Sequence, residues 1–168
     1  MQQTLLGMFV EPPRSIRLVH DSTRGLDSKS FWNAVLDVGP TLTIIRSTTN
    51  HVFGAVIYDT FRNTGGWIPG HADNFLFTLG NIGGTPVKLI KSFNGQTLDF
   101  GVCMFNIYTG LVVGGSDLLT FGGVDGRCIP RTFTTVAPGY TTVPVTDTLL
   151  AGSRTWTPDR IEVYAMEF

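Results

Sequence analysis

The chain has 168 residues, the length of one ordinary domain, which is enough to bury a sizeable core. Only 15% of its residues are charged, 42% are hydrophobic and 20 are glycine, a composition typical of short strands joined by turns. Twelve basic and thirteen acidic residues give a net charge of -1 without any basic run, which disfavours a nucleic-acid partner.

The first quarter of the chain predicts a strand followed by a helix. Apolar and polar residues alternate over residues 16–21, which is the period of a half-buried strand. Apolar residues then recur at helical spacing, and Asp27 or Ser28 can cap the beginning of this segment. Because Gly39 and Pro40 stop it, we expect one helix between these points.

A hairpin is predicted next. The strand-like runs over residues 42–46 and 52–58 are separated by a short polar segment that suits a tight turn. Gly54 lies inside the second run, where a missing side chain marks either a bulge or a close approach of another backbone.

The second half of the chain predicts further strands. After a loop over residues 62–70, residues 74–79 are apolar on both faces, which indicates a strand in the middle of a sheet. Residues 139–147 contain two prolines and predict an edge or a loop. Runs bounded by turns predict the remaining strands over residues 87–92, 100–108, 111–113, 118–121 and 161–166.

These elements predict a mostly β fold of the α+β class. Strands that recur about every eight to twelve residues are typical of a sandwich or barrel. We therefore expect two antiparallel sheets packed as a sandwich, with a few short helices, in a single domain over residues 1–168.

The sequence shows neither a signal peptide nor a transmembrane segment. Its first fifteen residues lack a basic region and are interrupted by Gly7, Glu11 and two prolines, so we expect no signal peptide. No apolar run is long enough to span a bilayer. We expect a cytoplasmic protein in which Cys103 and Cys128 are free, buried thiols, although the two could in principle pair.

Motifs for catalysis, metals and phosphate are weak. Gly114 and Gly115 precede Ser116 and Asp117, but the strand and helix that flank a nucleophile turn are missing. His71 and Asp73 stand two residues apart without a third ligand at metal-binding spacing. We expect no catalytic residue, no metal and no cofactor.

Glu162 is the polar residue that most requires a partner. It lies in a predicted strand with Tyr164 and Met166 on its face and Ile161, Val163 and Ala165 on the opposite one. A buried, unpaired carboxylate would be costly. Glu162 is therefore either a contact residue for a partner or an internal strut that holds neighbouring loops through backbone N–H donors. Asp73 is the carboxylate with which it could pair.

The order and spacing of several short segments resemble the TLDc domain, the domain of the oxidation-resistance proteins. The resemblance covers nearly the whole chain. It rests on Leu18-Val19, Arg24-Gly25-Leu26, Ser30-Phe31-Trp32, Pro40-Thr41-Leu42, Val52-Phe53-Gly54, residues 73–79, residues 111–115, Phe121-Gly122, residues 149–153 and Ile161-Glu162-Val163-Tyr164.

The resemblance implies binding residues at Gly70, Asp73, Gly114, Gly115 and Glu162. Two positions depart from the family pattern, because a phenylalanine, Phe61, stands where a tryptophan is usual and Asp73 stands where a glutamate is usual. The shorter acid keeps the charge but moves it by one methylene group.

The resemblance further implies a non-catalytic adaptor or regulator of the oxidative stress response. Proteins with this domain bind the peripheral sector of the vacuolar-type proton ATPase, so these subunits are the expected partner. Recruitment to membranes that carry the pump would then occur through that partner.

Two other classes of function stay open. A thiol- or carboxylate-dependent enzyme could use Cys103, although its apolar neighbours favour an inert thiol. A carbohydrate- or small-ligand-binding β-sandwich could instead use Trp67 and the nearby loop.

Overall fold

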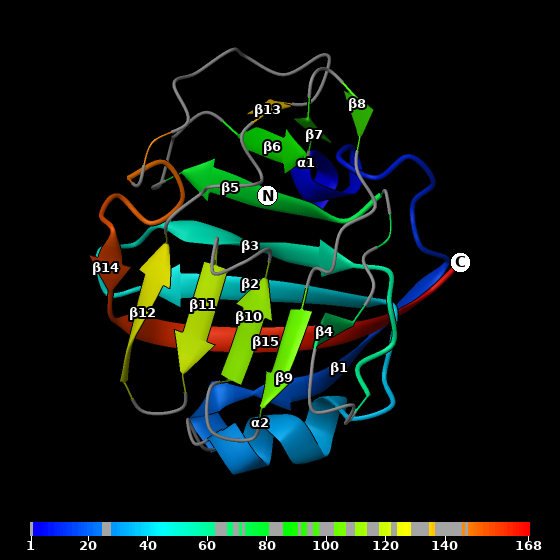
Figure 1. Ribbon diagram of the computed structural model, residues 1–168, viewed down its shortest axis with the longest axis horizontal. Coiled ribbons are helices and arrows are strands. Elements are labelled where there is room, and N and C mark those ends of the chain that lie inside the picture. Colours follow the sequence, from blue (N-terminus) through cyan, green and yellow to red (C-terminus); the bar gives the residue numbers. More distant parts are fainter. Residues whose placement is uncertain are drawn as a thin grey trace.

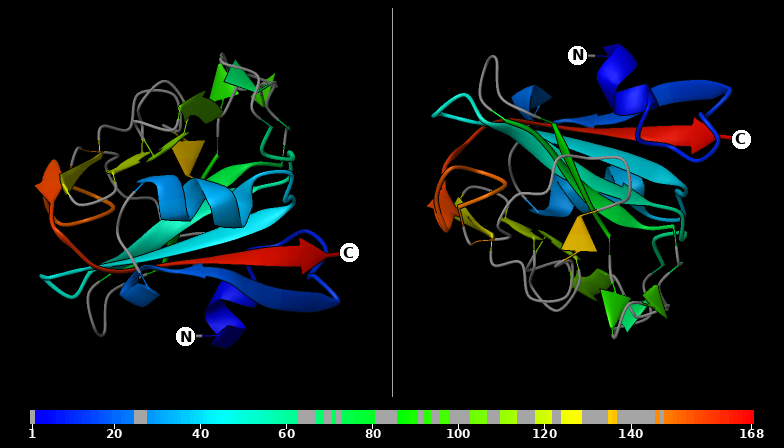
Figure 2. Two further views of the ribbon diagram at one scale, coloured as in Figure 1. Left: turned by 90° about the horizontal axis from the view of Figure 1, so that it is seen from below. Right: turned by 90° about the horizontal axis from the view of Figure 1, so that it is seen from above.

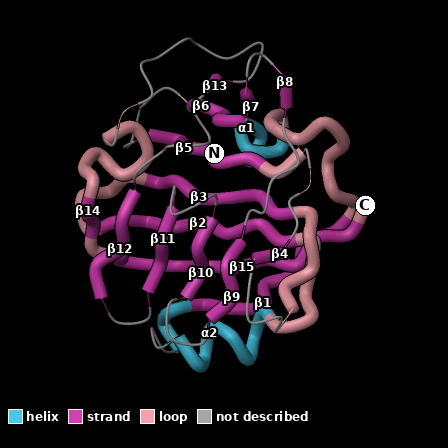
Figure 3. Tube along the Cα trace, in the orientation of Figure 1, coloured by secondary structure: helices cyan, strands magenta, loops and turns pink. Residues whose placement is uncertain are grey.

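The computed structural model is built mainly of antiparallel strands (Figures 1 and 3). Within the described residues, its helices are α1 (Gln2–Leu6), α2 (Ser28–Val35) and the 3-10 turn η1 (Ser22–Arg24). The mostly β fold is therefore confirmed. The structure describes residues 2–24, 28–62, 67–68, 71, 73–80, 86–90, 92–93, 96–97, 103–106, 110–113, 118–121, 124–128, 135–136, 146 and 148–168.

Seven strands form the larger sheet. The last strand of the chain lies between the first strand and the central hairpin and pairs with both, so segments about 140 residues apart are joined. The strand over residues 74–79 lies inside this sheet, as predicted. The spatial order is β1 (Ser15–Asp21), β15 (Pro158–Glu167), β2 (Thr41–Ser47), β3 (Val52–Ile57), β5 (Phe75–Gly80), β6 (Val87–Ile90) and β13 (Thr135–Val136).

Six shorter strands form a second sheet, which lies across one face of the larger sheet with its strands running crosswise (Figure 1). Packing of the two sheets as a sandwich stays a prediction, because the side chains of most of these strands lie outside the described residues. The spatial order is β14 (Thr155–Trp156), β12 (Val124–Cys128), β11 (Leu118–Phe121), β10 (Gly110–Val113), β9 (Cys103–Asn106) and β4 (Trp67–Ile68), and β7 (Ser92–Phe93) pairs separately with β8 (Gln96–Thr97).

Helix α2 forms where the apolar spacing predicts it but ends earlier. Asp37 has a positive φ of 58° and donates its backbone N–H to the carbonyl of Phe61 over 2.7 Å. This contact with a distant loop takes the chain out of the helical path before Gly39. The predicted stop at Gly39 and Pro40 is therefore too late.

The larger sheet has an apolar core on each face. The inner core contains Trp32 of α2, Phe53 of β3 and Trp156 of β14. The outer core is separate and is covered by the N-terminal segment, in which Phe9 packs edge-on against Phe75 at 5.6 Å. Figure 2 shows α1 on one side of the larger sheet and α2 with the smaller sheet on the other.

Lys88 fastens this N-terminal segment to the sheet. Its ammonium donates to the carbonyl of Met8 over 2.6 Å and lies 4.4 Å from the ring centroid of Phe75. A cation suits this place because Met8 follows the C-terminal end of α1. Burial lowers the pKa of Lys88, which is consistent with an ammonium held against apolar surroundings.

Candidate functional site

The outer face of β15 carries the side chains of the candidate site. Tyr164 and Met166 belong to the outer core, whereas Ile161 and Val163 belong to the inner core. The predicted alternation along this strand is therefore confirmed. Glu162 shares the outer face with Tyr164 because side chains two residues apart in a strand point the same way.

Glu162 is held in an ion network with two residues that the sequence did not single out. Arg160 donates from Nη2 to Asp21 Oδ2 over 2.8 Å and lies 2.9 Å from Glu162 Oε1. Asp21 and Glu162 are directly opposite each other in neighbouring strands, where two like charges destabilise a sheet. The guanidinium between them offsets this repulsion. This partner of Glu162 is a side chain, whereas the strut hypothesis expects backbone N–H donors from neighbouring loops, so that hypothesis stays a prediction.

The ion network lowers the pKa of Asp21. The hydrogen bond from Arg160, followed by that from the backbone N–H of Thr23, lowers the pKa of Asp21 from 3.8 to about 2. The folded chain therefore binds this proton more weakly than the unfolded chain. The stabilisation is fully present above the unfolded pKa of 3.8 and is lost as pH falls through the folded pKa of about 2.

We expect the free energy of unfolding of Asp21→Asn to depend less on pH below pH 5 than that of the wild-type chain. The wild-type chain should lose urea resistance between pH 5 and pH 2 more steeply than Asp21→Asn, so that the difference between the two chains becomes small near pH 2. Urea midpoints measured by circular dichroism across this range test the expectation. Identical slopes for both chains would show that Asp21 does not couple folding to pH.

An apolar groove adjoins this network on the outer face. It has a volume of about 450 Å³ and lies between the N-terminal segment and strands β1, β2, β5 and β15. Glu162 and Tyr164 contribute its polar groups. Burial, followed by the charge of Glu162, raises the pKa of Tyr164, so its hydroxyl stays neutral.

Asp73 lies in a separate place, on an exposed loop before β5. The backbone N–H of His71 and the side-chain amide of Asn74 both donate to Asp59 Oδ2, over 3.0 and 2.8 Å. Buried Asn74 in turn accepts from the backbone N–H of Tyr58 over 2.7 Å. These bonds anchor the loop, and Asp73 is presented with a side chain that is 53% exposed.

His71 lies beside Asp73 in this loop. The backbone N–H of Asp73 donates to His71 Nδ1 over 3.2 Å, and the same nitrogen lies 3.5 Å from the Asp73 carboxylate. The ring of His71 stacks on Tyr58 at 5.2 Å, and Phe168 stacks on Tyr58 at the same separation.

The five predicted binding residues do not form one cluster that the structure can describe. Asp73 and Glu162 are separated by three strand spacings, about 14 Å across the sheet, so they do not form a pair. Gly70, Gly114 and Gly115 lie outside the described residues.

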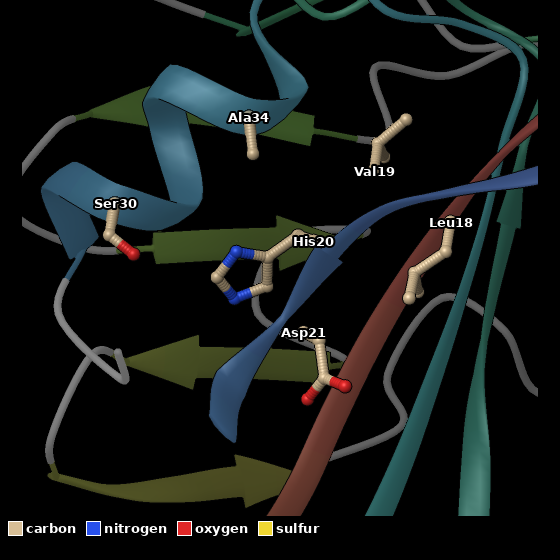
Figure 4. Close-up of a pocket in the computed structure, with 6 residues that line it drawn as sticks. All are labelled: Leu18, Val19, His20, Asp21, Ser30 and Ala34. Atoms are coloured by element: carbon tan, nitrogen blue, oxygen red, sulfur yellow. The ribbon is translucent and has the colours of Figure 1, made fainter. Parts of the chain in front are cut away.

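A second cavity of about 240 Å³ lies between β1 and α2. Figure 4 shows His20 pointing toward Ser30 and Ala34, while the Asp21 carboxylate points away from the imidazole. His20 also packs edge-on against Phe31 at 5.3 Å. The Asp21 carboxylate is bound to Arg160 on the other side of the strand.

The two cysteines are too far apart to pair. Cys103 is opposite Val113, Val113 is opposite Leu118, and Leu118 is opposite Cys128. Three strand spacings amount to about 14 Å, whereas Cα atoms in a disulfide lie about 4.4 to 6.8 Å apart. The side chains of Cys103, Cys128 and Trp67 lie outside the described residues, so the enzyme and carbohydrate alternatives stay predictions.

Neither a cluster of metal ligands nor a membrane-spanning helix is found in the described part of the chain. Within it, no three histidine, cysteine, aspartate or glutamate side chains come together as a metal site would require. Among the same residues, no helix has the length and apolarity needed to cross a membrane.

Comparison with known families supports the resemblance in the sequence. No curated protein matches the chain significantly. The family model of the TLDc domain, in contrast, matches residues 10–167 and so spans both sheets and the whole ion network of β1 and β15. This match covers nearly the full length and agrees with the mostly β fold, and the chain therefore belongs to the TLDc domain family.

Proposed function

We propose that this chain is a non-catalytic adaptor that binds the peripheral sector of the vacuolar-type proton ATPase and thereby contributes to resistance against oxidative stress. Membership of the TLDc family supports the connection with oxidative stress. Recruitment to pump-bearing membranes would follow from this partner.

The observation that carries the proposal is the way Asp73 is presented. Its carboxylate is 53% exposed, yet its loop is anchored by Asp59 and Asn74. A charge on an anchored loop loses little conformational freedom when it meets a partner, which favours recognition. Glu162, in contrast, is only 20% exposed and bound to Arg160, so in this proposal it supports the fold beside the interface.

Substitution of Asp73 tests the proposal. We expect purified wild-type chain to bind the isolated peripheral sector at micromolar concentration, and Asp73→Asn to weaken binding about fivefold, as a contact at an interface rim does. Asp73→Glu, which restores the usual family residue, should bind at least as tightly as wild type. Biolayer interferometry at two salt concentrations measures both effects.

Asp159→Asn is the matched control. Asp159 is also an exposed carboxylate, but it is paired with Arg46. This variant should bind like wild type. Absence of wild-type binding would refute the proposed partner, and equal losses in both variants would refute the role of Asp73.

A further inference from the structure

The groove on the outer face has the dimensions of a small-molecule site. Its volume of about 450 Å³ falls within the range of about 300 to 1,000 Å³ typical of ligand pockets. Leu42, Ile44 and Leu79 line it from the larger sheet, and Leu5 and Phe9 line it from the N-terminal segment. The apolar part of a bound ligand would be shielded from water in this groove.

The groove is open to solvent at its rim. Leu6 and Ile16 both line it, and they are 36% and 47% exposed. Two large apolar side chains that stay accessible beside a hollow allow a ligand to enter without unfolding of the N-terminal segment.

The polar groups of the groove select the charge of the ligand. Among the described residues that line it, Glu162 alone is charged, and no lysine, arginine or histidine is present. Asp21 and Glu162 share the single guanidinium of Arg160, so this end of the groove has one negative charge in excess. Tyr164 adds a neutral hydroxyl beside the carboxylate.

We propose that the groove binds a small cationic amphiphile, with its apolar body over Leu42, Ile44 and Leu79 and its ammonium group at Glu162 and Tyr164. A fatty amine has this chemistry. An ammonium group supplies hydrogen-bond donors to a carboxylate that retains acceptor capacity beyond its bonds to Arg160 and the Tyr164 hydroxyl. A fatty acid of the same length would bring a second negative charge to the same place. This inference is independent of the proposed partner.

Three probes of equal chain length test the proposal: decylamine, decanoate and decanol. Titration calorimetry below the micellar concentration should give wild-type binding of decylamine at least tenfold tighter than that of decanoate. In Glu162→Gln, decylamine should bind about tenfold more weakly, while decanol should bind as in wild type. Retained decanol binding shows that the variant still forms the groove.

Glu167→Gln is the matched control, because Glu167 lies on the same strand but is exposed and bonded to Ser15 over 2.9 Å. It should bind all three probes like wild type. A second readout is amide hydrogen exchange over residues 2–9, which decylamine should slow in wild type and not in Glu162→Gln. Equal binding of amine and acid, no binding of any probe, or an unchanged preference in Glu162→Gln would each overturn the proposal.

Discussion

Replacing Gly54 by alanine is expected to destabilise the chain by at least about 3 kcal/mol. A Cβ atom at this position would lie 1.9 Å from the backbone oxygen of Thr43 and 3.0 Å from the ring of Phe77. The first neighbour is backbone of the adjacent strand and cannot move aside as a flexible side chain can. Strands β2 and β3 would have to separate in the middle of the larger sheet, with loss of their hydrogen bonds.

Thermal and urea unfolding of Gly54→Ala measure this loss. A cost of 3 kcal/mol corresponds to a fall of roughly 6 to 12 °C in Tm for a chain of this length. Gly7→Ala is the matched control, because its added Cβ would meet nothing closer than 3.5 Å. It should be neutral or slightly stabilising through reduced freedom of the unfolded chain. Similar stabilities for the two variants would contradict the close approach.

Gly54 also illustrates what the sequence could predict about this fold. A glycine inside an apolar strand indicates either a bulge or a close backbone, and the regular register of Gly54 opposite Ile44 selects the close backbone. The central position of β5 was equally predictable, since its residues are apolar on both faces. Such predictions succeed for strands that are buried on both faces, because their burial is visible in the local sequence.

Elements that depend on distant contacts were missed. Helix α1 has five residues, little more than one turn and too few to show a repeat of apolar positions, and it is held by Lys88 from another part of the chain. Alternation cannot be read from strands of two residues, which are β4, β7, β8, β13 and β14. The end of α2 was misplaced because its determinant, the carbonyl of Phe61, lies in a later loop.

The candidate site was predictable only in part. Glu162 was found because a carboxylate between apolar neighbours requires a partner. Arg160 could have been found with it, since residues two apart in a strand share a face and opposite charges there can pair. Asp21 could not have been found this way, because it meets Arg160 only after strands 139 residues apart have paired.

Phe53→Ala is expected to cost about 3 to 5 kcal/mol, the usual range for a fully buried phenylalanine. Phe53 has no exposed surface, and its ring lies edge-on to Trp156 with 5.0 Å between centroids. Phe53 belongs to the larger sheet, whereas Trp156 belongs to β14 of the smaller one. The pair therefore connects the two sheets, and its loss should weaken their attachment as well as the inner core.

A double-mutant cycle separates these two effects. Phe53→Ala and Trp156→Leu, measured alone and together by urea unfolding, should show a coupling of about 0.5 to 1.5 kcal/mol, as edge-on aromatic pairs do. Phe77 provides the control, because it is equally buried but belongs to the outer core. Phe77→Ala should be as destabilising as Phe53→Ala yet additive with Trp156→Leu. Coupling of Trp156 to both phenylalanines, or to neither, would mean that the inner face of the larger sheet does not hold the smaller sheet through this contact.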